Sequence, residues 1–245
     1  MKLLQKLFGK KAEPSPFCSV VVVAAGNATR MEGVDKILCT LGGAPLLLHT
    51  LTPFQRSDLV DEIVIVTRED LMVPIGTLCS QRGLTKVRRI VKGGESRTES
   101  VQAGLSETSP DADLIGIHDG ARPFITKEIL EEVIQTARMR SAAAPAVPVK
   151  DTIKRVRDGV VAETPDRAEL FAVQTPQVFA AALIRAALAK ALEEKLSLTD
   201  DCAAVERLGC PVAITRGGEE NIKITTPSDL LLGEAILAAR EEGTE

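Results

Sequence analysis

The chain has 245 residues, a formal net charge of -4, a hydrophobic fraction of 44% and a charged fraction of 26%, which are ordinary values for a globular protein. The acidic balance and the 2% of aromatic residues argue against a nucleic-acid-binding protein that uses a broad basic surface and aromatic stacking. No apolar stretch reaches the roughly 18 residues of a membrane span, so a membrane is not an expected partner. Because of the acidic charge and the few aromatic residues, nucleic acid is not an expected partner either.

Residues 1–16 interleave lysines with leucines and Phe8, and we predict a flexible N-terminal extension. The lysines interrupt the apolar core that a secretion signal needs, and a weak membrane-surface role is the alternative. We expect residues 17–245 to form a single domain, because no Pro/Gly/Ser-rich linker divides them. Five cysteines without CxxC spacing, beside only two histidines, indicate reduced thiols in the cytoplasm and no zinc cluster.

Apolar runs of strand length recur along the chain, separated by segments with helical spacing. The runs are Ser19–Ala24, Glu62–Thr67, Val87–Val91, Asp113–Ile117 and Ala142–Val147, and the helical segments include Pro45–Arg56, Arg97–Glu107 and Lys127–Arg138. Continuous apolar runs are typical of strands that are covered on both faces. The pattern therefore predicts an α/β fold of Rossmann-like type, with a mostly parallel twisted sheet and helices on both faces.

An irregular polar insert follows at Val149–Arg167, where Asp158-Gly159 is the two-residue signal for a type I′ hairpin. We predict a protruding β-hairpin arm; because an isolated hairpin is marginal in water, the arm either contacts another subunit or is a surface flap. The remaining predicted elements are a strand near Leu170–Thr175, helices near Ala180–Leu192 and Asp201–Leu208, a strand pair around Val212–Thr225 and a helix from Pro227.

Three polar loops follow strands of the predicted sheet, at residues 26–36, 92–100 and 118–123. Ligands of open α/β sheets bind at the carboxyl ends of the strands. The first loop combines small residues with Arg30 and Lys36, which suits the phosphates of a nucleotide, although an ordinary strand-to-helix connection has the same local pattern. It matches neither GxGxxG nor GxxxxGK[ST], so neither a dinucleotide nor a P-loop site is predicted.

From about Phe17 onward the chain resembles the 2-C-methyl-D-erythritol 4-phosphate cytidylyltransferases of the non-mevalonate isoprenoid pathway. The resemblance rests on Ala24-Ala25-Gly26 with Arg30-Met31 and Lys36, Gly93-Gly94-Glu95-Ser96-Arg97 with Ser100, His118-Asp119-Gly120-Ala121-Arg122-Pro123, Asp151-Thr152 with Lys154, Asp166-Arg167, Thr175-Pro176-Gln177, Thr199-Asp200 and Asn221-Ile222-Lys223-Ile224-Thr225. The resemblance implies attack by an alcohol phosphate on the α-phosphate of CTP, which gives a CDP-alcohol and pyrophosphate.

The resemblance assigns catalysis to Arg30, Lys36 and Lys223, and Mg²⁺ binding to Asp119. Because the nucleophile is already an anion, these groups have to position the phosphates and stabilise their charge rather than remove a proton. His118 is predicted to pack rather than to bind metal. Lys223 stands between two isoleucines, where a lysine on a buried strand needs an anion, and a ligand phosphate would supply it.

The resemblance also implies two groups of substrate contacts. The CTP group is Ala24, Ala25, Gly26, Gly94, Glu95 and Ser100, and the alcohol-phosphate group is Arg122, Thr152, Arg167, Thr175 and Lys223. Thr152 and Arg167 lie on the predicted arm, and the family pattern brings them from a second subunit, so a homodimer through the arm is expected. Arg97 is expected to pair locally within its loop or to lie in a helix N-terminus capped by Glu95, Ser96 and Thr98.

Two positions depart from the family pattern: Ala28 replaces a glycine, and Asp35 replaces a proline and adds a negative charge beside the phosphates. The related alternative is a ribitol 5-phosphate cytidylyltransferase, against which Ala121 is a thin argument. A uridylyl- or guanylyltransferase gains no support from the segment around Lys223. The alternative from another class is a non-catalytic nucleotide-binding regulator, in which replacing Lys36 would only weaken binding, whereas in an enzyme it would abolish turnover.

Overall fold

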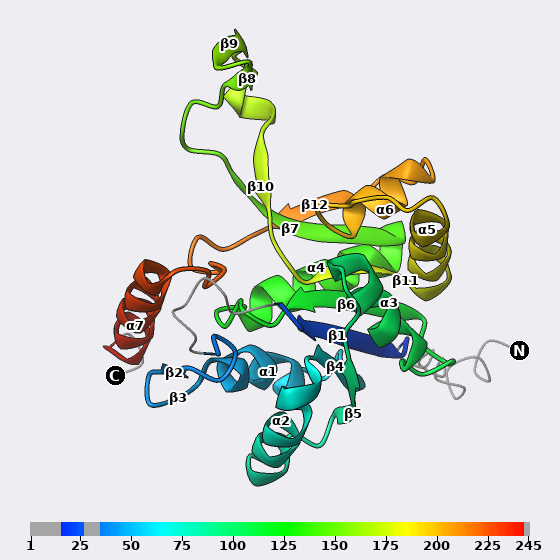
Figure 1. Ribbon diagram of the computed structural model, residues 1–245, viewed down its shortest axis with the longest axis vertical. Helices are drawn as coiled ribbons and strands as arrows, with labels where there is room; N and C mark the ends of the chain where they lie inside the picture. Colours follow the sequence, from blue (N-terminus) through cyan, green and yellow to red (C-terminus); the bar gives the residue numbers. More distant parts are fainter. Residues whose placement is uncertain (1–15, 27–34, 243–245) are drawn as a thin grey trace, which may run out of the picture.

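A central twisted sheet organises the computed structural model, which describes residues 16–26 and 35–242 (Figure 1). Its strand order is β10-β7-β11-β6-β1-β4-β5, with β12 paired to β7. The strands are β1 (Cys18–Ala24), β4 (Glu62–Thr67), β5 (Val87–Lys92), β6 (Leu114–Asp119), β7 (Ala142–Pro148), β10 (Phe171–Val173), β11 (Gln177–Ala180) and β12 (Ala213–Arg216). β1, β4, β5 and β6 are mutually parallel, whereas β11 runs antiparallel to both β6 and β7. The predicted α/β class is confirmed.

The helices cover both faces of this sheet, as predicted. α1 (Leu46–Arg56), α2 (Glu69–Gln81) and α4 (Lys127–Arg140) contribute to the hydrophobic core on one face. α3 (Arg97–Ser106), α5 (Ala181–Glu193) and α6 (Cys202–Arg207) contribute to the core on the other. α7 (Pro227–Glu242) packs separately, over β2 (Thr40–Leu41). Each predicted helix is present: the predicted ranges correspond to α1, α3, α4, α5, α6 and α7.

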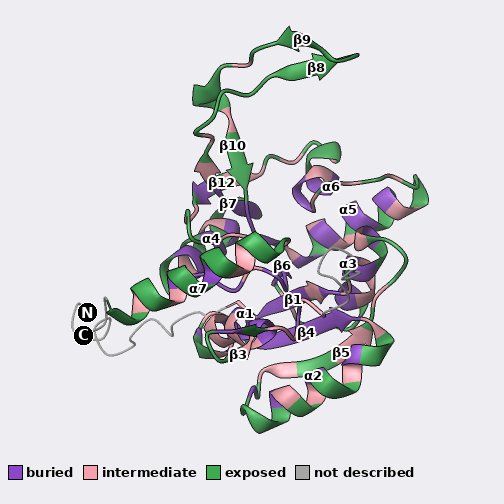
Figure 2. Ribbon diagram, turned by 60° about the vertical axis from the view of Figure 1, so that its left-hand side comes forward, coloured by how far each residue is buried: buried purple, intermediate pink, exposed green. Residues whose placement is uncertain are grey.

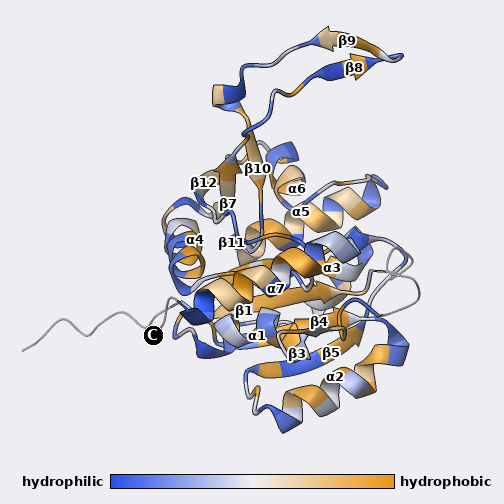
Figure 3. Cartoon of the chain, turned by 90° about the vertical axis from the view of Figure 1, so that its left-hand side faces the viewer, coloured by the Kyte–Doolittle hydropathy of each residue, from blue (hydrophilic) through white to orange (hydrophobic). Residues whose placement is uncertain are grey.

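Strand β1 shows why an apolar run marks the centre of the sheet. Successive side chains of a strand point to opposite faces, and Val20 and Val22 enter one core while Val21 enters the other. All three are almost inaccessible to solvent, and burying such a side chain contributes about 2 kcal/mol. Figure 2 shows the central strands as buried, and Figure 3 shows the same strands as hydrophobic.

The predicted arm is present as a two-stranded hairpin of β8 (Arg155–Arg157) and β9 (Val160–Glu163), which projects from the sheet (Figure 1). Asp158 and Gly159 both have positive φ, at 49° and 77°, as a type I′ turn requires. A 3₁₀ turn at Arg167–Glu169 returns the chain to β10. A second, smaller hairpin joins β2 to β3 (Ala44–Pro45) and was not predicted.

The predicted strand pair around Val212–Thr225 is wrong in its second half. β12 forms as a strand parallel to β7, but residues 217–226 form none. The side chain of Gln174 takes the place of a neighbouring strand: its Nε2 donates to the carbonyl oxygen of Gly218 (2.7 Å) and its Oε1 accepts from the amide of Gly218 (3.2 Å). Lys223 therefore lies on an irregular segment and not on a buried strand.

Part of the predicted organisation lies outside the described residues. The proposed N-terminal extension is described only at its last residue, and Ala28 and Arg30 fall in the undescribed stretch 27–34. The single-domain assignment for residues 17–245 stays a prediction. Among the residues that the structure describes, no helix has both the length and the apolar character needed to span a bilayer.

Candidate active site

A cavity of about 570 Å³ opens where β1, β4, β5 and β6 end. The chain runs from β1 to β4 on one side, while β6 lies on the other, so the cavity stands at the switch point where α/β sheets bind ligands. Its lining is drawn from loops that follow these strands, together with one residue near the C-terminus. The lining residues include Ala24, Ala25, Gly26, Lys36, Arg68, Gly93, Gly94, Glu95, Arg97, Ser100, Asp119 and Lys223.

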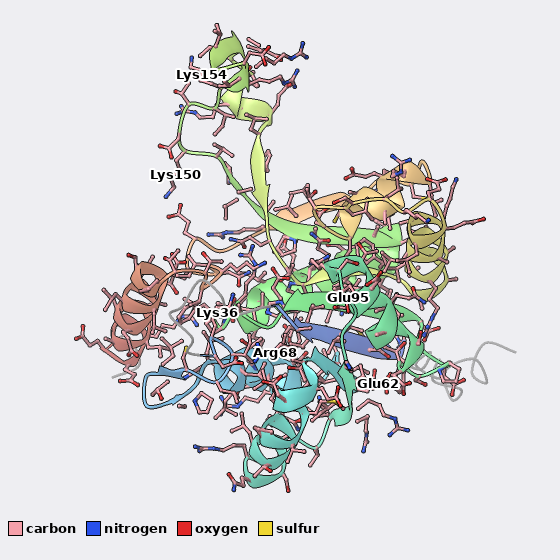
Figure 4. All side chains as sticks on the ribbon, viewed as in Figure 1. Lys36, Glu62, Arg68, Glu95, Lys150 and Lys154 are labelled. Carbon is pink, nitrogen blue, oxygen red and sulfur yellow. The ribbon has the colours of Figure 1, made fainter. Side chains whose placement is uncertain are left out.

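The cavity brings together all six predicted CTP contacts and three of the other predicted site residues, Lys36, Asp119 and Lys223. Arg122 and Thr175 do not line the cavity, but both contact Asp119, which does. Thr152 and Arg167 are on the exposed arm; Figure 4 shows Lys150 and Lys154 of the arm well away from Lys36 and Arg68. The described residues do not include Arg30.

The second loop is shaped by hydrogen bonds within the sequence Gly93 to Ser100. Ser96 caps α3 by accepting from the amide of Glu99 (3.1 Å), and the Glu99 carboxylate accepts from the amides of Glu95 and Ser96. This reciprocal capping box confirms Ser96 as the cap, but Glu99, rather than Glu95 or Thr98, completes it. Ser100 Oγ accepts from the amide of Gly94 (3.1 Å) and donates to the carbonyl oxygen of Ser96 (2.9 Å). Ser100 thus holds the turn that faces the cavity.

Replacing Gly93 by alanine is expected to weaken nucleotide binding. A Cβ atom there would lie 2.6 Å from the Cβ of Ala25 and 2.7 Å from Ser100 Oγ, so the first and second loops would have to separate. We expect the KM for CTP to rise about tenfold or more, a loss of about 1.4 kcal/mol or greater. Gly76→Ala in α2 is the control, because its Cβ would make an ordinary 3.6 Å contact with the side chain of Ile90 in β5. An unchanged KM in Gly93→Ala would contradict this packing argument.

Asp119, the last residue of β6, is surrounded by cationic side chains. Its carboxylate oxygens lie 2.7 Å from Lys223 Nζ, 3.7 Å from Arg97 Nη2 and 3.8 Å from Arg122 Nε. Burial alone would raise the pKa of Asp119, but Lys223, Arg97 and Arg122 together lower it below its usual value. The anion that partners Lys223 is therefore Asp119, where the sequence analysis expected a ligand phosphate.

Arg97 and Asp201 form a buried ion pair that the sequence analysis missed. Two nitrogens of the guanidinium donate to the two Asp201 oxygens at 3.0 and 2.6 Å, and the Asp201 side chain is only 1% exposed. The expected local pairing of Arg97 is wrong, because its partners are Asp201, which immediately precedes α6, and Asp119 of β6. The motif Thr199-Asp200 is next to Asp201 and was the available signal, but it does not reveal a partner on a distant loop.

The negative charge of Asp35 is compensated by Arg68, which follows β4. Arg68 Nη2 lies 2.5 Å from Asp35 Oδ2 and 2.9 Å from Asp70 Oδ2, and Arg68 itself lines the cavity. Asp35 also accepts a hydrogen bond from the amide of Ile37 (3.1 Å). The expectation that Asp35 simply adds an adverse charge therefore overlooks its pairing with Arg68.

His118 is a packing residue, as predicted. It is fully buried, and its ring meets Phe54 edge-on with 4.9 Å between ring centroids. Thr175 Oγ1 accepts from the amide of Asp119 (3.0 Å), so its proton points to His118 Nδ1 (3.0 Å). His118 Nε2 then donates to the carbonyl oxygen of Arg122 (3.0 Å). This network uses both ring nitrogens of a neutral imidazole and fixes the backbone at Asp119.

His118 gives a prediction for the pH dependence of stability. Burial lowers its pKa from 6.5 to about 4, so between these values only the unfolded chain takes up the proton. The free energy of unfolding should keep its full value above pH 6.5 and fall by about 3 kcal/mol as the pH drops to 4. Chemical denaturation without Mg²⁺ or nucleotide measures it. His118→Gln should flatten this slope relative to wild type, whereas His49→Gln should keep it; equal slopes for His118→Gln and wild type would contradict the assignment.

Comparison with known proteins places nearly the whole chain in one family. Residues 18–239 match the family model described as 2-C-methyl-D-erythritol 4-phosphate cytidylyltransferase. A relative of that name from Halalkalibacterium halodurans is 48% identical, with 91% of this chain and 98% of the relative aligned. Another, from Caldanaerobacter subterraneus, is 44% identical over 89% of this chain and 98% of the relative.

Solved structures agree with this placement. The crystal structure of 4-diphosphocytidyl-2C-methyl-D-erythritol synthase from Anaerococcus prevotii has a TM-score of 0.83 and 32% identity, covering 91% of this chain and 97% of that one. The 2-C-methyl-D-erythritol 4-phosphate cytidylyltransferase from Thermus thermophilus has a TM-score of 0.74 and 32% identity, over 89% and 98% of the two chains. Because sequence and fold agree over nearly the full length of these relatives, the chain belongs to the 2-C-methyl-D-erythritol 4-phosphate cytidylyltransferase family.

Proposed function

We propose that this protein transfers the cytidylyl group of CTP to 2-C-methyl-D-erythritol 4-phosphate. The products are 4-diphosphocytidyl-2-C-methyl-D-erythritol and pyrophosphate, in the formation of isoprenoid precursors by the non-mevalonate route. The observation that carries the proposal is the cavity at the switch point, where Lys36, Lys223 and Asp119 face a wall of small residues. Family membership supplies the substrates.

The arrangement of charges suits phosphoryl chemistry without a general base. The attacking phosphate oxygen is already ionised, so the protein has to align two anions and stabilise the charge on the α-phosphate. Lys36 and Lys223 reach the cavity from opposite ends of the sequence, and Arg30 is assigned a third position by the family pattern. On binding, the substrate phosphates would draw Lys223 from Asp119, its partner in the free protein.

Asp119 is the proposed Mg²⁺ ligand, and its surroundings fit that metal. Among residues 16–26 and 35–242 there is no cluster of three or more His, Cys, Asp or Glu that could hold a metal by itself. Magnesium commonly uses one or two carboxylates and takes its other ligands from substrate phosphates and water. Asp119 offers one carboxylate on the cavity, held in orientation by Arg97 and Arg122. When bound, the ion would neutralise developing charge on the triphosphate.

The wall opposite the cations is the proposed base site. Ala24, Ala25, Gly26, Gly93 and Gly94 all line the cavity, and the two loops approach closely at Ala25 and Gly93, where a Cβ added at Gly93 would lie 2.6 Å from the Ala25 Cβ. A pyrimidine held by backbone groups in such a space leaves no room for a purine. Ser100 supports the site by fixing Gly94 through its hydroxyl.

We also propose a homodimer through the arm, in which Thr152 and Arg167 of one subunit complete the alcohol-phosphate site of the other. Every residue of β8, β9 and β10 is exposed, including large apolar side chains: Val160 is 70% exposed and Phe171 is 46% exposed. A two-stranded hairpin with exposed apolar residues gains stability from a partner surface.

The five cysteines are free thiols, which supports a cytoplasmic location.

The direct test is Mg²⁺-dependent pyrophosphate release from CTP with 2-C-methyl-D-erythritol 4-phosphate. Ribitol 5-phosphate and the three other nucleoside triphosphates serve as competing substrates. Turnover restricted to the first pair would support the proposal. Turnover with ribitol 5-phosphate would assign a different alcohol to the same mechanism, and no turnover with any pair would favour a nucleotide-binding regulator.

A further inference from the structure

Two buried glutamines flank the Thr175-Pro176 dipeptide between β10 and β11. Gln174 is 6% exposed and Gln177 is 2% exposed, yet neither faces the cavity. Each side-chain amide instead bonds to a distant segment that carries a residue of the site. Thr175, between them, accepts the hydrogen bond from the amide of Asp119. Residues 174–177 therefore bond to the backbone of Asp119, to the segment that leads to Lys223 and to the segment whose carboxylate pairs with Arg97.

Gln174 holds the irregular segment that leads to Lys223. Its amide bonds to both backbone groups of Gly218, and its Oε1 also accepts from Asn221 Nδ2 (3.2 Å). Asn221 is fully buried, and its carbonyl oxygen accepts from Arg122 Nη1 (2.7 Å). A side-chain amide carries one acceptor and two donor hydrogens, so it can replace the backbone of a missing strand. Gln174 does this on the side of the segment that precedes Lys223.

A second anchor follows Lys223 directly. The amide of Ile224 donates to the carbonyl oxygen of Ala121 (2.9 Å), which belongs to the loop after β6. The backbone is thus held before Lys223 by the contacts of Gln174 and after Lys223 by this bond. The half-exposed side chain of Lys223 reaches Asp119 at 2.7 Å. Without Gln174, the segment that precedes Lys223 would lose its bonds at Gly218 and one bond of the Asn221 amide. It would keep the bonds that Asn221 makes with Arg122 (2.7 Å) and with the carbonyl oxygen of Thr175 (3.1 Å).

Gln177 acts in the same way on the segment that contains Asp201. Its Oε1 accepts from the amides of Asp201 and Cys202 (both 3.0 Å), and its Nε2 donates to Asp200 Oδ2 (2.9 Å). Asp201 has no side-chain capping bond to α6, because its carboxylate is used for Arg97. The backbone of Asp201 is therefore placed by Gln177 and its side chain in turn places Arg97.

We propose that Gln174 and Gln177 are positioning residues for the transfer reaction: their side-chain amides set Lys223 and Arg97 against Asp119 from its two sides. This role rests on the proposed function, because it concerns the geometry of groups that would act on the phosphates. Neither glutamine lines the cavity, so the proposed role is exerted through the residues that they position, Lys223 and Arg97.

A double-mutant cycle between Gln174 and Lys223 tests this role. Gln174→Ala should lower kcat about tenfold or more, because a misplacement of about 1 Å can cost a hundredfold, and should change the KM for CTP less than twofold. In the Lys223→Ala background the same change should lower kcat no further, within about twofold, because the group it positions is gone. An equal loss of kcat in both backgrounds would overturn the proposal.

Conservative variants and controls keep the outcome interpretable. Gln174→Glu keeps the acceptor oxygen but places a second oxygen against the Gly218 carbonyl oxygen. The kcat of this variant should fall between those of wild type and Gln174→Ala. Gln174→Glu replaces Gln174→Ala in the double-mutant cycle if the alanine variant does not fold. Gln55→Ala is the matched control, since its amide ties Lys86 and Thr85 outside the cavity, and its kcat should not change. A kcat for Gln55→Ala as low as that of Gln174→Ala would overturn the positioning role.

The corresponding cycle pairs Gln177→Ala with Arg97→Ala and should show the same lack of additivity. Full activity of Lys223→Ala would contradict the proposed function itself. A strong loss in Lys223→Ala combined with additive effects of Gln174→Ala would instead contradict only the positioning role. Thermal unfolding of each variant identifies losses that come from an altered fold.

Discussion

Replacing Lys36 by alanine is expected to lower kcat/KM for pyrophosphate release about a thousandfold, which corresponds to about 4 kcal/mol of transition-state stabilisation. Lys36 is the last residue of the first loop and lines the cavity together with Gly93 and Gly94. An ammonium group placed against developing phosphate charge acts most strongly when the bound substrates exclude water from the site. Steady-state pyrophosphate release, with CTP and the alcohol phosphate varied separately, measures the loss.

Lys92→Ala is the matched control for this substitution. Lys92 also borders the cavity, but its ammonium is paired with Glu69 at 2.7 Å and both side chains are largely exposed. Exposed ion pairs contribute little, so kcat/KM should change less than about threefold. Equal losses in both variants would indicate a general effect of charge at the rim. Full activity of Lys36→Ala would contradict the mechanism. It would indicate that Lys36 is a surface charge with no role in catalysis.

The sheet could be predicted closely because its central strands are buried on both faces. The predicted strand Glu62–Thr67 is identical to β4, and the other central strands agree within a few residues. α2 was not among the named helices, since Pro74 and Gly76 interrupt its helical pattern. β11 has four residues and adjoins α5, so its short apolar stretch does not stand apart from the pattern of that helix and it was not predicted. The prediction of a second strand around residues 217–225 was wrong, because the side chain of Gln174, and not a neighbouring strand, bonds to the backbone of Gly218.

The site could be predicted only as far as single loops allow. Each predicted CTP contact follows a recognisable strand, so its place at the sheet edge was foreseeable. The pairs that set the electrostatics join distant parts of the chain: Lys223 with Asp119, Arg97 with Asp201, and Arg68 with Asp35. Nothing in the local pattern of Arg97 indicates that a carboxylate more than 100 residues later will be its partner. Such pairing is a property of the packed fold.

A mixed dimer of Asp119→Asn and Arg167→Ala subunits is expected to regain activity that neither variant has alone. Arg167 lies on the exposed arm, where its Nη1 donates to the carbonyl oxygen of Lys150, and Asp119 lies at the cavity. If the arm of one subunit completes the cavity of the other, the mixed dimer contains one site with both wild-type residues. Its activity should be about half that of the wild-type dimer, because one of two equivalent sites is intact.

The measurement uses co-expressed subunits with different affinity tags, so that the mixed dimer can be isolated and assayed for pyrophosphate release. A mixed dimer of Asp119→Asn with Lys36→Ala is the matched control; both changes lie in the cavity, so neither of its sites is intact and it should stay inactive. If the arm served its own subunit, the first mixed dimer would be as inactive as this control. Failure to isolate any mixed dimer, or full activity of Arg167→Ala alone, would contradict the exchange of arms. A half-active mixed dimer requires both Arg167 in the reaction and its delivery from the partner, because no other arrangement of the two substitutions leaves one site whole.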